Sequence, residues 1–463
     1  MKLLIFSLLY LLVAITAELT VLSSESCFYL LATVFVFNAC CIATDFKSLP
    51  SLTLIYIFGF LFLLFEPLIY INNGLGFPTW FELSTQSLYA GFDYVLMISL
   101  FMFSLNTSYL WLKFARKKNE RNNDTVIKFC NQKTSWFALA VILLFLVIGF
   151  IPYISNGFDY FIFLLISGRS DGFSQFDVSA VGNTNFLTIL SNFIIACGIY
   201  SGTLLIVRDD MALKRIFLYA VLVFSILIIA SGGGRTRAGF IIVPLLYIYF
   251  NYRVTNIRNI GKFLFVLLAS GLLILSMVSL RDKGVESSEV DFELTGFNLN
   301  RELYYILSQK DYFPLVCESS ALCALLPLTD TVEKFVTNPV PRLLYSGKYL
   351  DPSFSFYNNL RLGNSGLYKG SNITPTAIGR YYMLYGTYGV VFVGLLFGFF
   401  ASYVDRKLLL EKDVSKVIFL STLMYYIAQS IRDLNPGWLY PSVFTFLLVY
   451  LINKVDYDSN YRS

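Results

Sequence analysis

Apolar residues are concentrated in long runs that short polar connections separate. Runs of about 17 mostly apolar residues can cross ~30 Å of hydrocarbon as a helix. Twelve such windows occur, a few of them slightly short: about 2–17, 27–43, 51–70, 91–113, 136–152, 187–207, 213–230, 238–252, 262–280, 378–403, 415–432 and 437–453. No period of about 20–50 residues repeats. The pattern predicts an all-α fold, a polytopic membrane helix bundle of about 12 transmembrane helices.

Composition supports a membrane protein. Of the 463 residues, 56% are hydrophobic and 14% are charged, whereas about a quarter of the residues are charged in a soluble protein. The first window resembles a signal peptide, but the many spans that follow favour an uncleaved first helix. The net charge of +5 is scattered over short loops, which predicts no nucleic-acid partner.

Lysine and arginine are distributed unequally between alternate loops. Of the 35 basic residues, 21 lie at the two termini, at Lys47 and in four loops: 113–133, 208–215, 251–262 and 404–416. Because short cytoplasmic loops carry the excess of positive charge, this set and both termini are predicted to be cytoplasmic. The short loops of the opposite set contain no lysine and four arginines, Arg169, Arg235, Arg237 and Arg432.

The windows divide the chain into three parts. Residues 1–280 are predicted to hold transmembrane helices 1–9, residues 281–377 a long external loop, and residues 378–463 transmembrane helices 10–12 with a cytoplasmic tail. Within the long loop, 301–310 and 314–335 carry apolar residues at helical spacing. We therefore expect a small helical cap on the outer mouth of the bundle.

Metal chemistry is not indicated. The chain has no histidine, and its seven cysteines lack metal-ligand spacing, so no metal and no cofactor are expected. Cys317 and Cys323 could pair in an oxidising compartment, although free cysteines are the favoured interpretation.

The external arginines are the first candidates for function, because a charge at such a helix end is costly unless it is paired or hydrated. In SGGGRTRAGF (231–240), three glycines that include Gly233 and Gly234 allow an anion to approach the backbone closely. A helix that begins near Thr236 would add its free N–H groups. Arg235 and Arg237 beside it predict a pyrophosphate site, and the alternative is that both extend to lipid headgroups.

A similar arrangement occurs in NITPTAIGRYYMLYGTYGVVFVG (372–394). Thr374 is predicted to cap a helix that begins at Pro375, which places Arg380 about five residues into the helix. The tyrosines at 381, 382, 385 and 388 form either an aromatic wall for sugars, in which Tyr381 is the first candidate for binding, or an interfacial belt.

The third candidate is RDLNPGW (432–438), where Arg432 ends one span and Asp433 follows it. Either the pair closes a hairpin, or Arg432 binds phosphate and Asp433 acts as a base or an orienting group. Among the external carboxylates, Asp351 is the first choice as base, although no carboxylate spacing identifies an acid/base couple. Arg342 and Arg361 flank Asp351 and, with Arg169, are further ligand candidates.

With SGGGRTRAGF between two spans, a long outer segment late in the chain and NITPTAIGRYYMLYGTYGVVFVGLLFGFF after it, the sequence resembles the bacterial O-antigen polymerases, the oligosaccharide repeat-unit polymerase family. The resemblance covers essentially the whole length and rests on the order and context of these motifs.

The resemblance implies a metal-independent membrane glycosyltransferase of the C-type superclass in the bacterial inner membrane, with its active site facing the periplasm. It would transfer a growing glycan from undecaprenyl pyrophosphate to the terminal sugar of an incoming lipid-linked repeat unit. The arginines would neutralise the departing pyrophosphate. The implied partners are undecaprenyl-pyrophosphate-linked oligosaccharide, membrane lipid and, as a further candidate, a chain-length regulator protein.

Two alternatives remain. One is the related ligase that transfers finished glycan to a lipid A core, which we would expect to use an external histidine. The other is a flippase or transporter for lipid-linked oligosaccharides. Transporters tend to have internal repeats and charges at mid-membrane, whereas the external charges here are predicted to gather at one surface.

Overall fold

The computed structural model of the chain describes residues 2–74, 90–115, 135–154, 189–207, 211–231, 235–253, 299–308, 376–411, 413–432, 434 and 439–461. Over these residues every regular element is a helix, and no strand occurs. The predicted all-α class is therefore confirmed for this part of the chain.

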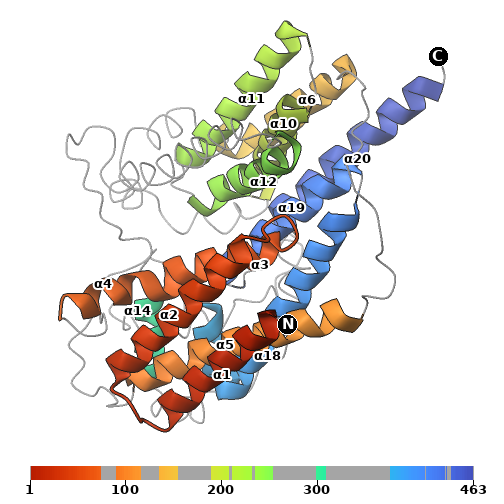
Figure 1. The fold of residues 1–463 in the computed structure, drawn as a ribbon. Coiled ribbons are helices and arrows are strands. Elements are labelled where there is room, and N and C mark those ends of the chain that lie inside the picture. Colours follow the sequence, from red (N-terminus) through yellow and green to blue (C-terminus); the bar gives the residue numbers. More distant parts are fainter. Residues whose placement is uncertain are drawn as a thin grey trace.

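Helices from the beginning of the chain form one side of the molecule (Figure 1). They are α1 (Lys2–Glu18), α2 (Ser24–Ala43), α3 (Pro50–Gly59), the π-helix η1 (Phe60–Leu64), α4 (Phe65–Asn72) and α5 (Ala90–Ala115). Two later helices, α14 (Leu299–Ser308) and α18 (Ala377–Leu410), join them. The central member is α5, which packs against α1, α2, α14 and α18. Segments far apart in sequence are thus direct neighbours.

The other side of the molecule is built around α10 (Asn192–Val207). It packs against α6 (Trp136–Ile154), α11 (Ala212–Ser231), α12 (Arg235–Arg253) and α20 (Tyr440–Tyr461). One helix, α19 (Val414–Gln429), contacts α12 and α20 on this side and α3 and α18 on the first side (Figure 1). The two sides are therefore joined through α19.

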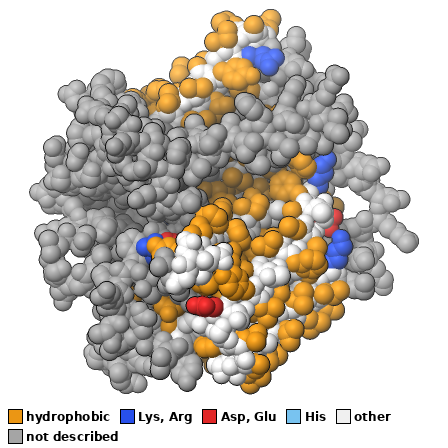
Figure 2. Space-filling model, turned by 60° about the vertical axis from the view of Figure 1, so that its left-hand side comes forward, with side chains coloured by type: hydrophobic (Ala, Val, Ile, Leu, Met, Phe, Trp, Pro, Cys, Tyr) orange, Lys and Arg blue, Asp and Glu red, His pale blue; other side chains and the backbone are white. Residues whose placement is uncertain are grey.

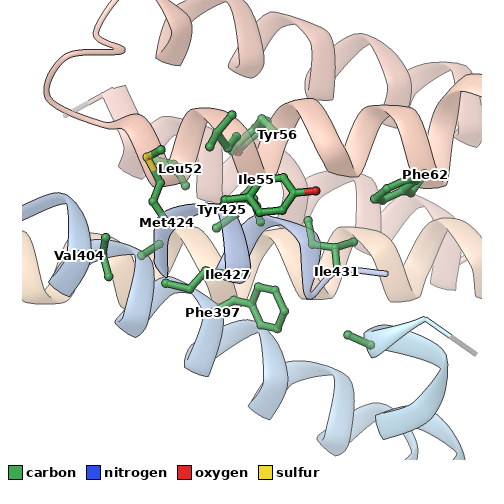
Figure 3. Close-up of a cluster of buried hydrophobic side chains, with 14 of the residues drawn as sticks. Leu52, Ile55, Tyr56, Phe62, Phe397, Val404, Met424, Tyr425, Ile427 and Ile431 are labelled. Atoms are coloured by element: carbon green, nitrogen blue, oxygen red, sulfur yellow. The ribbon is translucent and has the colours of Figure 1, made fainter. Parts of the chain in front are cut away.

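Apolar side chains fill the contact that α19 makes with α3 and α18 (Figure 3). The labelled members are Leu52, Ile55, Tyr56 and Phe62 from the first side, Phe397 and Val404 from α18, and Met424, Tyr425, Ile427 and Ile431 from α19 and the turn after it. Leu52 and Met424 are fully buried. Close packing of these side chains holds α19 in a fixed position.

Small residues bring α18 close to α5. A methyl group built on Gly394 would lie 2.0 Å from the Ser104 Oγ, and one built on Gly398 would lie 2.0 Å from the Ser108 Oγ. Glycine and serine four residues apart on facing helices allow the two backbones to approach, as in membrane helix pairs. The long α18 is thereby packed tightly along α5.

The predicted windows can be compared with these helices. Eleven of the twelve coincide with helical segments, and 262–280 lies outside the described residues. Five segments are long and apolar enough to cross a membrane: Ser24–Ala43, Pro50–Asn72, Ala90–Leu112, Ala212–Ile229 and Ala377–Leu410. The structure thus supports a multi-pass helical membrane protein. Of the predicted external loop 281–377 it describes only α14, Thr376 and Ala377, so most of the helical cap lies outside the described residues.

The surface of the described part is rich in apolar side chains. On α1, Leu4, Leu8 and Leu12 are each more than half exposed. Figure 2 shows the same character over the described part of one face, where hydrophobic side chains predominate and charged ones are few. Contiguous apolar surface of this kind needs a cover, which a lipid bilayer supplies.

A buried carboxylate joins three helices at the end of α18. Asp405 is 1% exposed and accepts hydrogen bonds from the Ser51 N–H at 2.7 Å and the Leu52 N–H at 3.4 Å. Both donors belong to the first turn of α3, whose N–H groups have no partner within the helix. The Tyr109 hydroxyl of α5 donates to the same carboxylate at 2.8 Å. Asp405 therefore supplies, from another helix, the N-terminal cap that Leu49 does not provide.

Candidate functional site

The start of α12 packs directly against the end of α19. A methyl group built on Gly239 would lie 2.0 Å from the Tyr425 hydroxyl oxygen, so only glycine fits there. The Tyr425 ring also meets Phe240, with the ring centroids 4.7 Å apart, and Phe58 of α3 at 5.8 Å. Arg237, two residues before Gly239, is half-buried. Arg235 begins α12.

The start of α18 reaches the same end of α19. The Ala377 N–H donates to the Ile431 carbonyl at 3.0 Å. Thr376 caps α18, because its hydroxyl oxygen accepts from the Gly379 N–H at 3.0 Å. The predicted cap at Thr374 was therefore wrong by two residues. Arg380 lies in the first turn of α18 and is 9% exposed.

Arg432 completes this group. It ends the turn that follows α19, where its N–H donates to the Gln429 carbonyl at 2.9 Å, and its side chain is half-buried. The positive charge of Arg432 interacts electrostatically with the Tyr425 hydroxyl. We call the start of α12, the start of α18 and the end of α19 the arginine end. It brings together three helices that carry the predicted Arg237, Arg380 and Arg432.

The predicted tyrosine wall is only partly formed. Tyr381 is 5% exposed beside Arg380, whereas Tyr388 is 87% exposed and Tyr385 is 47% exposed. The helix α18 is interrupted at Gly386, which has φ 61° and ψ −149°, after Tyr385 and before Tyr388. The tyrosines thus face different surroundings. Tyr381 remains a candidate for the site, and the exposed pair fits an interfacial belt.

The sequence interpretation missed a buried carboxylate on another helix, α4. Glu66 of α4 pairs with Arg301 of α14: the Arg301 Nε donates to Glu66 Oε1 at 2.8 Å, a second guanidinium nitrogen contacts the same oxygen, and Tyr70 also accepts from Arg301 at 2.9 Å. The other carboxylate oxygen, Oε2, is buried and has no hydrogen-bond partner. A carboxylate inside an apolar window is the signal that could have identified it.

α14 connects Glu66 to the start of α18, which is one part of the arginine end. A methyl group built on Gly379 would lie 2.7 Å from the Ile306 Cδ1, so α14 lies against the start of α18. The Tyr304 ring packs beside Tyr94 of α5, with centroids 6.3 Å apart. Burial raises the pKa of the Tyr304 hydroxyl above its ordinary value, so this phenol remains protonated near neutral pH.

A change in helix geometry precedes Glu66. Pro67 has no N–H and cannot bond to the Leu63 carbonyl four residues earlier. The chain forms the π-helix η1 there, and the Tyr94 hydroxyl donates to the carbonyl that Pro67 leaves free. π-helical turns within α-helices often occur at functional sites. Here the turn sets the position of Glu66 relative to α3.

The remaining predicted residues can be placed only in part. Asp433, Asp351, Arg169, Arg342, Arg361, Gly233 and Gly234 lie outside the described residues. For Arg235 the backbone alone is described. Within the described ranges, no group of three or more histidine, cysteine or acidic residues could hold a metal. Cys317 and Cys323 also fall outside them, whereas Cys27, Cys40, Cys41 and Cys197 are free thiols.

The fold defines a class, a multi-pass helical membrane protein with cationic residues gathered at one end. Comparisons with protein families, with curated proteins and with solved structures find no match to this chain. The function must therefore be argued from the site.

Proposed function

We propose that the protein is a membrane glycosyltransferase that polymerises lipid-linked oligosaccharide repeat units. The observation that carries the proposal is the arginine end, where three helices distant in sequence bring Arg237, Arg380 and Arg432 to one region. Cationic side chains collected in this way suit an anion with several charges. A lipid-linked pyrophosphate is such an anion, and it would enter from the bilayer that the apolar surface implies.

The membrane arrangement belongs to the same proposal. The bundle has about 12 transmembrane helices, with the termini and the lysine-rich loops in the cytoplasm. The arginine end then faces the periplasm of a bacterial inner membrane, and 281–377 forms a cap over it. This orientation is supported by the positions of α12, α18 and α19, which place Lys416 and the arginine end at opposite ends of α19.

The reaction follows from the charges. A hydroxyl oxygen of the acceptor sugar forms a bond to the anomeric carbon of the growing glycan, and the bond from that carbon to the pyrophosphate oxygen breaks. The arginines stabilise the negative charge that develops on the leaving pyrophosphate. A carboxylate accepts the hydroxyl proton. Glu66 has a free oxygen for this task, and Asp351 and Asp433 remain candidates from the sequence.

The test compares charges at the two ends of α19. Arg432→Ala should lower polymer formation by about 100-fold or more, measured as glycan length on gels and in vesicles that contain a lipid-linked repeat unit. Lys416→Ala removes an exposed cation that pairs with Glu411 at 3.6 Å and should leave the ladder unchanged. Glu66→Gln should lower the rate with little loss of protein, because glutamine can still accept from Arg301.

Two results would refute the proposal. The first is a normal chain-length ladder in Arg432→Ala at wild-type protein levels. The second concerns deletion of the gene: a polymerase deletion leaves single repeats attached to the acceptor, whereas stranding of repeat units in the inner leaflet would identify a flippase instead.

A further inference from the structure

Within the described residues, the buried side-chain amide of Gln429 has no hydrogen-bond partner. It ends α19 and is 1% exposed, and neither its Oε1 nor its Nε2 has a partner. A buried polar group left unpaired costs about 1–3 kcal/mol, so a glutamine that serves only packing is unfavourable here. A leucine or methionine would fill the same space without that cost.

The position of Gln429 links it to the arginine end. It lies four residues after Tyr425 on α19, so these two side chains share one face of the helix, and it lies three residues before Arg432, which belongs to the turn after α19. Tyr425 meets Gly239 of α12. The turn that follows Gln429 also contacts the start of α18, because the Arg432 N–H donates to the Gln429 carbonyl at 2.9 Å and the Ala377 N–H donates to the Ile431 carbonyl at 3.0 Å. The unpaired amide therefore lies where the cations gather.

The chemistry of an amide restricts its ligand. Phosphate oxygens at neutral pH accept hydrogen bonds, so a phosphate would satisfy the Nε2 donor and leave the Oε1 acceptor unpaired. Sugar hydroxyls both donate and accept, and two neighbouring hydroxyls match both ends of an amide. Arg432 lies in the turn directly after α19, where its N–H donates to the Gln429 carbonyl at 2.9 Å. Gln429 and Arg432 can thus contact adjoining groups of one ligand.

We infer that Gln429 binds the sugar that is attached directly to the pyrophosphate, while Arg432 binds the phosphate beside it. This inference rests on the proposed function and extends it, because it assigns recognition of the first sugar to one residue. The site would then distinguish a glycosylated lipid pyrophosphate from the bare lipid pyrophosphate that the reaction releases. Product release would follow from the loss of the sugar contacts.

The experiment measures binding of two probes to the full chain in lipid nanodiscs: polyprenyl pyrophosphate that carries one sugar, and the same lipid without sugar. Gln429→Met keeps the length of the side chain and removes both polar ends. It should weaken binding of the glycosylated probe about tenfold, the equivalent of ~1.4 kcal/mol, and leave binding of the bare lipid unchanged. Its thermal midpoint should equal or exceed that of the wild type.

Asn38→Leu is the matched control, because Asn38 is also a fully buried amide but lies on α2, outside the arginine end. It should leave the preference for the glycosylated probe intact. Gln429→Leu replaces Gln429→Met if the latter does not accumulate. A preference that persists in the Gln429 variant overturns the inference and leaves the proposed function standing. If the wild type binds neither probe, the proposed function fails, and the inference with it.

Discussion

Asp405 provides the sharpest test of how the bundle is held together. Its carboxylate accepts three hydrogen bonds, from Ser51, Leu52 and Tyr109. Replacement by alanine leaves all three donors buried. Bonds to a charged group are each worth about 1.5–3 kcal/mol, and the 3.4 Å bond from Leu52 counts as weak. Relief from burying a charge offsets part of the loss. We expect Asp405→Ala to cost about 3–5 kcal/mol.

Two further variants divide this cost. Asp405→Asn keeps one acceptor oxygen but loses the negative charge that stabilises the N-terminus of α3, an effect of about 0.5–2 kcal/mol. Its amide NH2 group would also face the N–H and O–H donors that the carboxylate now accepts from. Tyr109→Phe removes a single bond and should cost about 1 kcal/mol. Asp405→Ala combined with Tyr109→Phe should cost less than the sum of the two, because both changes remove the same hydrogen bond.

The assay is the free energy of unfolding in mixed micelles, with Asp413→Ala as the control. Asp413 caps its own helix, α19, by accepting from the Ser415 N–H at 2.9 Å, and it is exposed. An exposed cap is worth about 1 kcal/mol. If Asp405→Ala destabilises the protein no more than Asp413→Ala does, the buried cap does not hold α3, α5 and α18 together as described.

Two other predictions concern glycines. Gly239→Ala places a methyl group 2.0 Å from the Tyr425 hydroxyl and should destabilise the protein by about 1–3 kcal/mol while it lowers polymer formation; an unchanged melting temperature would argue against the α12–α19 contact. Gly386→Ala meets no atom within 4 Å but must adopt φ 61° with ψ −149°, a conformation essentially restricted to glycine, so it should cost about 1–3 kcal/mol. Gly386→Asn should cost a similar amount, because asparagine tolerates the left-handed helical region and not this one. Melting temperatures equal to that of the wild type for both Gly386 variants would contradict the break in α18.

The sequence was sufficient to predict features that depend on local runs of residues. Hydropathy located the helices because each apolar window is contiguous. Hydropathy did not reveal Glu66, because it is averaged over a window and one carboxylate barely changes the mean hydropathy of residues 51–70. Thr374 and Thr376 each offer a capping hydroxyl, and nothing local distinguishes them. Thr376 is the cap in a structure where the next residue, Ala377, donates a backbone hydrogen bond to the Ile431 carbonyl. These two residues are more than fifty positions apart, so the sequence near the helix start does not reveal the contact.

The gathering of the arginine end depends on contacts that one sequence does not reveal. The sequence alone assigns no role to Gly239, yet the absence of a side chain at this position leaves the space that the Tyr425 hydroxyl occupies. Buried polar groups also differ in how they are satisfied. At Asp405 three donors meet one carboxylate, as a structural contact requires. Within the described part of the chain, the Gln429 amide at the arginine end and one oxygen of Glu66 on α4 have no partner. Because an unpaired buried group costs free energy, stability alone does not account for these two side chains, and a ligand that pairs with them would.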